Sequence, residues 1–191
     1  MIVLHVISGL NRGGAELALL NYLRVSSKDR SVTHKVICLN PSTSLSLQIR
    51  DLGIQVRHYD LKDNFLNIWS LYRGFKSINP DVVHTWMYHA DLIGGLIAKA
   101  QGVKNILWSI HNSSPIDLPR FKSTRWVVFF LAKLSGFIPS VILSPSKKAS
   151  DSHINYGYSP KNFVEVPLGI DTKKYEYRLS SKNAFCTSNN I

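Results

Sequence analysis

The residues best suited to chemistry begin directly after the first apolar run, in the stretch "GLNRGGAE" at residues 9–16. Because glycine has no Cβ, backbone N–H groups at Gly13 and Gly14 can approach a phosphate or a sugar hydroxyl closely. The spacing excludes a dinucleotide fingerprint, since Asn11 stands where G-x-G-x-x-G needs a glycine. It also excludes a Walker loop, since Ala15 follows Gly14. We predict that this loop faces an anion or a sugar; the alternative is a plain tight turn.

Three histidines lie near the ends of predicted strands. His84 and His89 flank the end of the fourth strand, and His111 ends the fifth in "SIHNSS". Because the carboxyl ends of parallel strands share one edge of the sheet, we expect His89 and His111 in the same crevice. An imidazole there can exchange a hydrogen bond with a hydroxyl near neutral pH, although each histidine could equally be structural. Neither a zinc spacing nor a G-x-S-x-G elbow accompanies them, so we predict no metal and disfavour a hydrolase.

A third candidate is the segment "LPRFKSTRWVVFFLAKLSGFIP" at residues 118–139. Cations beside exposed aromatic rings suit an anionic bilayer surface. The residues expected on such a surface are Arg120, Lys122, Arg125, Trp126 and Lys133. The alternative is a helix whose apolar residues all pack on the sheet while its cations are merely solvated. Nucleic acid is not an expected partner, because no recognised binding module accompanies the basic residues.

Charge and cysteine content narrow the partners and the compartment. The net charge of +11 favours anionic partners. Much of the excess lies between Arg120 and Ser150, a stretch with six Lys or Arg residues and no Asp or Glu. Cys38 and Cys186 form no disulfide framework, which favours a reducing, cytoplasmic compartment. The longest apolar run, residues 126–143, is interrupted by Lys133, Gly136 and Pro139, so it predicts a helix and a strand and not a membrane span.

Short β-branched runs alternate with helical segments along the chain, and this alternation predicts βαβ units. These units must position the candidate residues. Strands are expected at residues 2–8, 34–39, 54–59, 81–86, 105–111, 140–144 and 163–167. Helices are expected at residues 14–25, 43–52, 65–78, 91–101, 124–137 and 147–156. The fourth helix is expected to begin at Asp91, as N-cap, and to stop at Gly102. Right-handed crossovers then predict a doubly wound α/β fold, a mostly parallel Rossmann-like sheet of about seven strands with helices on both faces.

The motifs in their order resemble a known family. "GLNRGGAE", "PDVVHTWMYHADLIGGLIAKAQGV", "SIHN", "SPSK" and "VPLGID" are similar to the N-terminal domain of retaining, GT-B fold glycosyltransferases of family 4. These enzymes typically build lipopolysaccharide, capsule or other surface glycans. The resemblance covers nearly all of residues 1–175 and implies the acceptor side of an interdomain cleft. The domain is expected at residues 1–171, followed at 172–191 by a polar linker or disordered tail.

The resemblance also implies roles for particular residues. Gly13 and Gly14 would lie next to the donor phosphates or the transferred sugar, and His111 matches the family histidine at the reacting centre. Arg12, His89 and Asn112 are expected in the acceptor-side cleft. The nucleotide sugar is the implied donor substrate, and no cofactor is expected. The acceptor would be a glycan or a lipid-linked sugar.

The family's second domain carries two glutamates separated by seven residues, and this chain departs from that pattern. Its glutamates are Glu16, Glu165 and Glu176, which cannot supply the pair. We therefore expect half an enzyme that lacks the C-terminal donor-binding domain and is inactive alone. It would be an expressed domain, a truncated gene product or one subunit completed by another chain. A surface that normally meets a second domain would also favour self-association.

Two other functions stay open on the sequence. The chain could be a non-catalytic module that binds a partner chain or an anionic membrane through residues 120–138, at the inner face of the plasma membrane. A nicotinamide-dependent oxidoreductase is disfavoured because the dinucleotide fingerprint is absent.

Overall fold

A single parallel sheet organises the chain. The computed structural model describes residues 1–41, 44–61, 64, 66–115 and 122–169. Seven strands pair in the order β3-β2-β1-β4-β5-β6-β7, and each pairing among them is parallel. The strands are β1 (Ile2–Ile7), β2 (Thr33–Cys38), β3 (Gln55–His58), β4 (Val82–Trp86), β5 (Asn105–Ser109), β6 (Val141–Ser144) and β7 (Phe163–Glu165).

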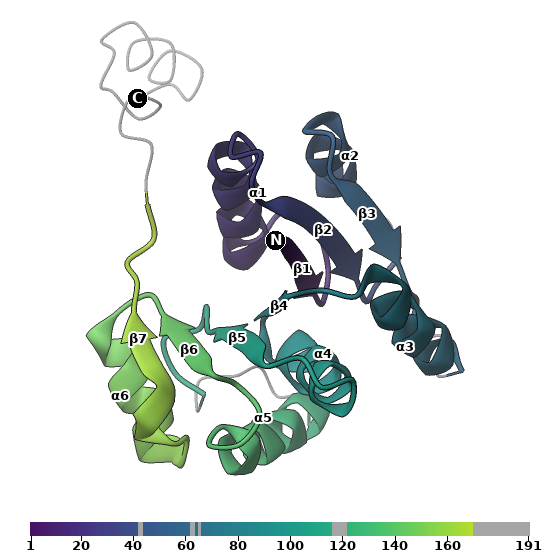
Figure 1. The fold of residues 1–191 in the computed structure, drawn as a ribbon. Helices are drawn as coiled ribbons and strands as arrows, with labels where there is room; N and C mark the ends of the chain where they lie inside the picture. Colours follow the sequence, from purple (N-terminus) through teal and green to yellow (C-terminus); the bar gives the residue numbers. More distant parts are fainter. Residues whose placement is uncertain (42–43, 62–63, 65, 116–121, 170–191) are drawn as a thin grey trace, which may run out of the picture.

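Helices cover both faces of this sheet. They are α1 (Gly14–Ser26), α2 (Ser44–Asp51), α3 (Asn67–Ile78), α4 (Tyr88–Ala100), α5 (Lys122–Leu134) and α6 (Lys147–Tyr156), with a 3₁₀ turn at Pro160–Asn162. Figure 1 shows α1 and α2 on one side of the sheet and α4, α5 and α6 on the other. The predicted fold class is confirmed: this is a doubly wound, Rossmann-like α/β domain.

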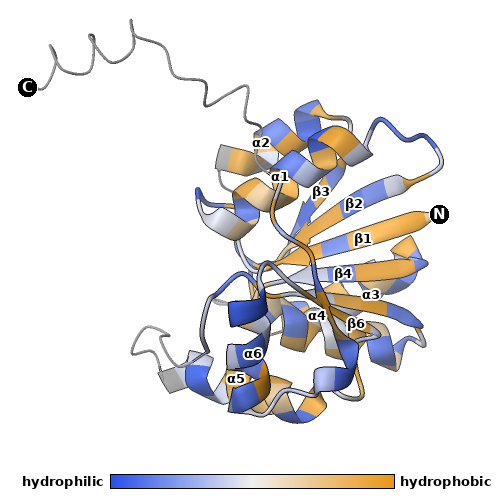
Figure 2. Ribbon diagram, turned by 90° about the vertical axis from the view of Figure 1, so that its left-hand side faces the viewer, coloured by the Kyte–Doolittle hydropathy of each residue, from blue (hydrophilic) through white to orange (hydrophobic). Residues whose placement is uncertain are grey.

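Two apolar cores hold the layers together, one on each face of the sheet. Alternation along β1 sends Leu4 and Val6 into the core beneath α3, α4 and α5, and Ile7 into the core beneath α1 and α2. The central strands are therefore buried on both faces, and in Figure 2 they are orange over much of their length with blue stretches between. Fully burying one such large apolar side chain contributes roughly 1.5–3 kcal/mol.

The predicted start of the fourth helix is wrong by one turn. The helix begins at Tyr88, and Asp91 lies inside its first turn, where it is 1 % exposed. Its Oδ1 accepts a hydrogen bond from the hydroxyl of Thr85 in β4 at 2.6 Å. The carboxyl therefore links the helix to this strand and does not cap the helix. Burial raises the pKa of the Asp91 carboxyl well above its ordinary value. The predicted stop is confirmed, because Gly102 follows the helix at φ +78°.

Helix α4 packs unusually close to the sheet at two consecutive glycines. A Cβ on Gly94 would lie 3.0 Å from Thr85 Cγ2, and one on Gly95 would lie 2.8 Å from Trp108 Nε1. The absence of both side chains therefore lets the helix axis approach β4 and β5. This contact fixes the first turn of α4 relative to the ends of those strands.

Candidate functional site

The strand order reverses between β1 and β4, which places three loops side by side at the carboxyl edge of the sheet. Strands β1, β4 and β5 are consecutive neighbours in the sheet. The glycine loop follows β1, residues 87–89 follow β4, and residues 110–112 follow β5. Open α/β sheets bind ligands at this kind of switch point. The fold thus brings the loops carrying Arg12, Gly13, His89, His111 and Asn112 to one edge.

The glycine loop ends at the amino terminus of α1. Gly13 is the N-cap and has no side-chain cap, while the Leu17 N–H donates to the Gly13 carbonyl at 3.1 Å. Glu16 folds back so that its carboxylate occupies the space a Cβ on Gly13 would need. A carboxylate at this position is stabilised by the helix dipole and the free N–H groups of the first turn. The same groups would interact favourably with any other anion.

Gly14 differs from Gly13 in its surroundings. No heavy atom lies within 4 Å of where its Cβ would be, and the residue is exposed. Its conformation is helical, so neither space nor backbone geometry in this fold requires glycine there. Close approach of a ligand would require it, and the anion-facing role of this position stays a prediction beside the tight-turn alternative.

The backbone is strained where β4 meets α4. Met87 has φ +75° and ψ 153°, a conformation that side-chain-bearing residues rarely adopt. Its N–H donates to the Ser109 carbonyl at 3.3 Å, and its carbonyl accepts from the Asp91 N–H at 2.9 Å. The sharp turn aims the free N–H groups of the first turn of α4 toward the carboxyl edge. Strain of this kind costs about 1–3 kcal/mol and gathers at functional sites.

His111 lies flat against the indole of Trp86. The two rings stack with centroids 5.2 Å apart and an interplanar angle of 12°. Within the described structure the Nε2 atom of His111 is buried and has no hydrogen-bond partner. Burial lowers the pKa of the His111 imidazole to about 4, so the ring is neutral at physiological pH. A neutral, fixed imidazole with one unsatisfied nitrogen has the capacity for one further hydrogen bond, which a ligand could make once Nε2 is uncovered.

A chain of buried side chains holds Trp86 in place. The Trp86 Nε1–H donates to His5 Nδ1 at 3.3 Å, and the rings of His5 and His34 meet through Nε2 and Nδ1 at 3.0 Å. Because an indole N–H can only donate, His5 Nδ1 must accept, and His5 carries its proton on Nε2. The His5 Nε2–H then donates a hydrogen bond to His34 Nδ1. His34 then donates from Nε2 to the Ser26 hydroxyl at 2.7 Å. Burial keeps the pKa of His5 well below its ordinary value, so this chain is uncharged.

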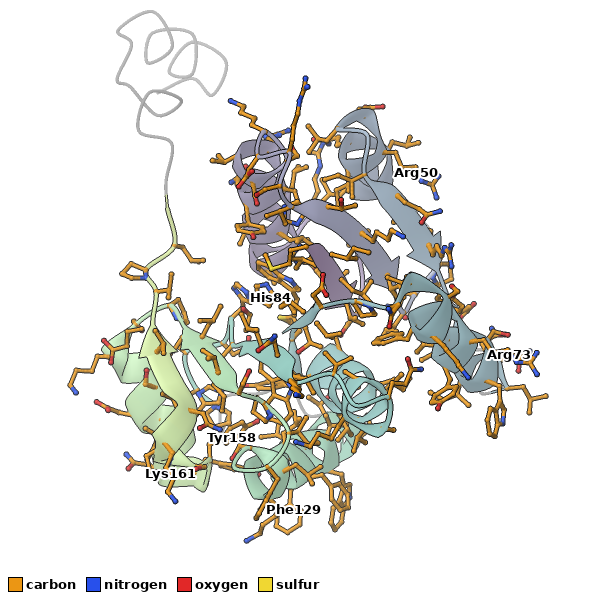
Figure 3. The ribbon with its side chains drawn as sticks, viewed as in Figure 1. Arg50, Arg73, His84, Phe129, Tyr158 and Lys161 are labelled. Atoms are coloured by element: carbon orange, nitrogen blue, oxygen red, sulfur yellow. The ribbon has the colours of Figure 1, made fainter. Side chains whose placement is uncertain are left out.

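His84 also packs against the Trp86 indole. Its ring centroid lies 4.4 Å from that of Trp86, and its Nε2 shares a hydrogen bond with the Ser109 hydroxyl at 2.6 Å. Burial, with a smaller effect from nearby His111, lowers the pKa of His84 to about 3. His84 lies near the centre of the molecule in Figure 3 and is 8 % exposed. It is therefore a structural histidine, one of the two interpretations open on the sequence.

The first turn of α4 is tied to α6. Tyr88 is 4 % exposed, and its hydroxyl lies 2.8 Å from His153 Nε2. His153 Nδ1 donates to the Ala149 carbonyl at 2.8 Å, which leaves Nε2 to accept from the tyrosine. The Asn112 side chain lies near the Tyr88 hydroxyl, where it partly offsets the rise in the Tyr88 pKa that burial causes. Asn112 therefore lies close to the start of α4, whereas His89 is exposed, and the ring contact of His111 among the described residues is with Trp86 and not with His89.

The basic aromatic residues lie on a separate surface. Arg125, Trp126 and Lys133 are exposed on α5, and Lys122 begins that helix. Arg120 lies outside the described residues, as do Cys186 and the predicted tail at 172–191. No helix in the described part of the chain is long and apolar enough to span a membrane.

Sequence reasoning missed Trp86, Met87, Tyr88 and His153. A signal was present for the first, because His5 interrupts the apolar strand "IVLHVI" and a buried histidine needs a partner. The tyrosine–histidine pair joins residues 65 positions apart, which no local pattern reveals. The strain at Met87 follows from how β4 and α4 meet, and methionine as a residue type does not indicate a positive φ.

The family is decided by a match over most of the chain. The model of Glycosyltransferase Family 4 matches residues 12–174. The chain belongs to this family. It shares the GT-B half-fold, so the predicted recognition is confirmed in family and fold. Comparison with curated protein sequences gave no match.

Solved structures agree with the family-4 fold. Anabaena HepE in complex with UDP-glucose aligns with TM-score 0.80 at 14 % identity, over 100 % of this chain and 50 % of that one. A glycosyltransferase from Rickettsia africae aligns with TM-score 0.67 at 14 % identity, covering 100 % and 49 %. MurG from Acinetobacter baumannii aligns with TM-score 0.62 at 14 % identity, covering 92 % and 47 %. The chain thus spans about half the length of these structures.

Proposed function

We propose that this chain is the acceptor-side half of a glycosyltransferase that acts in surface polysaccharide synthesis. The observation that carries the proposal is the fixed, neutral imidazole of His111, stacked on Trp86 with its Nε2 unsatisfied. It lies at the end of β5, beside the loops that follow β1 and β4. These three loops form one wall of a cleft, and a donor-binding domain of the GT-B type, on this or another chain, would form the opposite wall.

The reaction exchanges two bonds at the anomeric carbon of the donor sugar. The bond to the diphosphate oxygen breaks, a bond to an acceptor hydroxyl oxygen forms, and the hydroxyl proton leaves with the diphosphate or to solvent. The N–H groups of Gly14 and its neighbours would stabilise negative charge on the leaving diphosphate, displacing the Glu16 carboxylate. The resemblance to retaining enzymes implies retention of configuration.

His111 would contact the transferred sugar, while Arg12, His89 and Asn112 would face the acceptor. The pKa of His111, lowered to about 4, keeps the ring uncharged, so it would orient a hydroxyl by hydrogen bonding and would not act as a cationic acid. Trp86, His5 and His84 are positioning residues in this scheme, because they act through the His111 ring. No metal or other cofactor is proposed.

The acceptor side can be tested on the chain itself by nuclear magnetic resonance. Titration with glucose, galactose and N-acetylglucosamine should give saturable shifts in the His111 ring and in the amides of Asn112 and Met87. The Lys76 and Lys99 amides, on the outer surfaces of α3 and α4, serve as internal controls. Sugar-dependent shifts confined to residues away from the carboxyl edge would contradict the proposed site.

A further inference from the structure

Helix α5 is apolar on two faces, and only one of them is buried against the rest of the domain. Val128, Leu131 and Ala132 are buried in the core beneath the sheet. Trp126, Phe129 and Phe130 point the other way and are 63 %, 43 % and 50 % exposed. A helix that is apolar nearly all round has a second apolar environment to fill. Figure 3 shows Phe129 projecting from the outer side of α5, away from the rest of the domain.

The exposed rings form one contiguous cluster. Trp126 contacts Phe129 edge-on at a centroid distance of 6.1 Å, and Phe130 lies 6.4 Å from Trp126 and 5.8 Å from Phe129. Lys133 places its Nζ 5.8 Å from the Phe129 ring. The spacing 126, 129, 130 and 133 puts all four side chains on one helical face. We call these residues, together with Arg125, the outer face of α5.

We propose that the outer face of α5 docks on the surface of an anionic lipid bilayer. The rings would enter the boundary between headgroups and acyl chains, and Arg125 and Lys133 would contact lipid phosphates. Charge favours lipid over a second copy of the chain. The sequence from Arg120 to Ser150 has no acidic residue, so two outer faces brought together would oppose their cations without a counter-charge.

The docking would bring lipid to the candidate site. Helix α5 connects the parallel strands β5 and β6, so it runs from the carboxyl edge back to the amino edge. Its first turns, with Arg125 and Trp126, therefore lie at the end of the helix nearest the loops that carry His111. The inference does not depend on sugar transfer, because lipid binding is measured without it.

Vesicle flotation with the full 191-residue chain tests the docking. Vesicles of roughly two parts phosphatidylcholine to one part phosphatidylglycerol should bind the chain, and phosphatidylcholine alone should bind it far more weakly. The double variant Arg125→Gln, Lys133→Gln should lose about fivefold in affinity per cation removed. The double variant Trp126→Ala, Phe130→Ala should lose at least about tenfold, because two large rings no longer enter the interface.

A matched control comes from α3. Trp69 is 66 % exposed there, close to the exposure of Trp126, so Trp69→Ala and Lys76→Gln should leave vesicle binding unchanged. Brominated lipid should quench the fluorescence of Trp126 in a Trp69→Phe background, since Trp86 and Trp108 are buried. The reciprocal Trp126→Phe variant should show little quenching.

Three results would overturn the docking. The first is no binding to anionic vesicles by a chain whose circular dichroism is folded. The second is binding that neither double variant weakens. The third is concentration-dependent dimerisation that the Trp126 and Phe130 substitutions abolish while vesicles remain unbound, which would assign the face to a second copy.

Discussion

At the scale of single residues, His111 is the group whose surroundings constrain its role most tightly. Trp86 fixes the plane of its ring, and burial leaves one nitrogen without a partner in the described structure. The sequence indicated a functional histidine at this position from its place at the end of the fifth strand, and the family resemblance added its role at the reacting centre. The residues that hold the ring, above all His5 and Trp86, are far apart in sequence, so the precision of the site could not be predicted from local patterns.

Burial of neutral histidines predicts a particular loss of stability in acid. The pKa of His111 is lowered to about 4 and that of His84 to about 3. In the unfolded chain both titrate near about 6.5, so below that pH the unfolded state binds protons that the folded state cannot. The free energy of unfolding should fall as pH drops below about 6.5, by up to about 1.4 kcal/mol per pH unit for each residue.

Thermal unfolding followed by circular dichroism between pH 7.5 and pH 5 checks this. The His84→Asn variant should show a shallower dependence of Tm on pH than wild type, whatever its absolute Tm. A wild-type Tm that stays level across this range would contradict the assignment of His84 and His111 as neutral, buried rings.

Alanine substitutions at Gly14 and Gly95 distinguish a glycine proposed to face a ligand from a glycine needed for helix packing. Gly14→Ala should keep or raise stability by up to about 1 kcal/mol, because its Cβ meets nothing and alanine favours helix. The same change should lower sugar transfer at least tenfold, if N–H groups there approach the diphosphate. Gly95→Ala should destabilise by about 1–3 kcal/mol, because its Cβ would crowd Trp108. Chemical denaturation measures the stability of both variants, and a transfer assay measures their activity. Unchanged transfer in Gly14→Ala would favour the tight-turn alternative.

At the scale of elements, the turn from β4 into α4 carries the largest departure from expectation. The N-cap preference of aspartate placed the helix start at Asp91, but the chain turns sharply at Met87 and begins the helix one turn earlier. Propensity could not show this, since methionine gives no hint of a positive φ. Strands and the other helices were predicted within a few residues, because β-branched runs and apolar periodicity are local signals.

The strain at Met87 can be measured by comparing two substitutions. Met87→Gly should be more stable than Met87→Ala by about 1–2 kcal/mol, because glycine adopts this φ and ψ without penalty. At an exposed position inside the same helix the order should reverse, with Leu96→Ala more stable than Leu96→Gly by about 1 kcal/mol. Urea unfolding of the four variants gives both differences. An alanine variant as stable as the glycine variant at position 87 would mean that the turn is not strained.

At the scale of the whole molecule, the chain provides one Rossmann-like half of a GT-B fold. Its sheet, its two cores and the carboxyl edge were predictable, because a doubly wound topology follows from the order of its elements. Val164 in β7, and Val166 and Leu168 after it, are exposed apolar residues at the stretch where the family resemblance implies a crossing to a second domain. In the proposed function the catalytic cleft requires a second wall, so this half without one should transfer sugar negligibly.

The most direct measurement is sugar transfer by this chain joined to a donor-binding half of the same family, with that half's own nucleotide sugar as donor, compared between wild type and His111→Ala. The account predicts a fall in kcat of at least about a hundredfold, equivalent to roughly 2.7 kcal/mol of lost transition-state stabilisation, with Tm nearly unchanged. Turnover by His111→Ala within about twofold of wild type would contradict the assigned role of His111 and with it the proposed site.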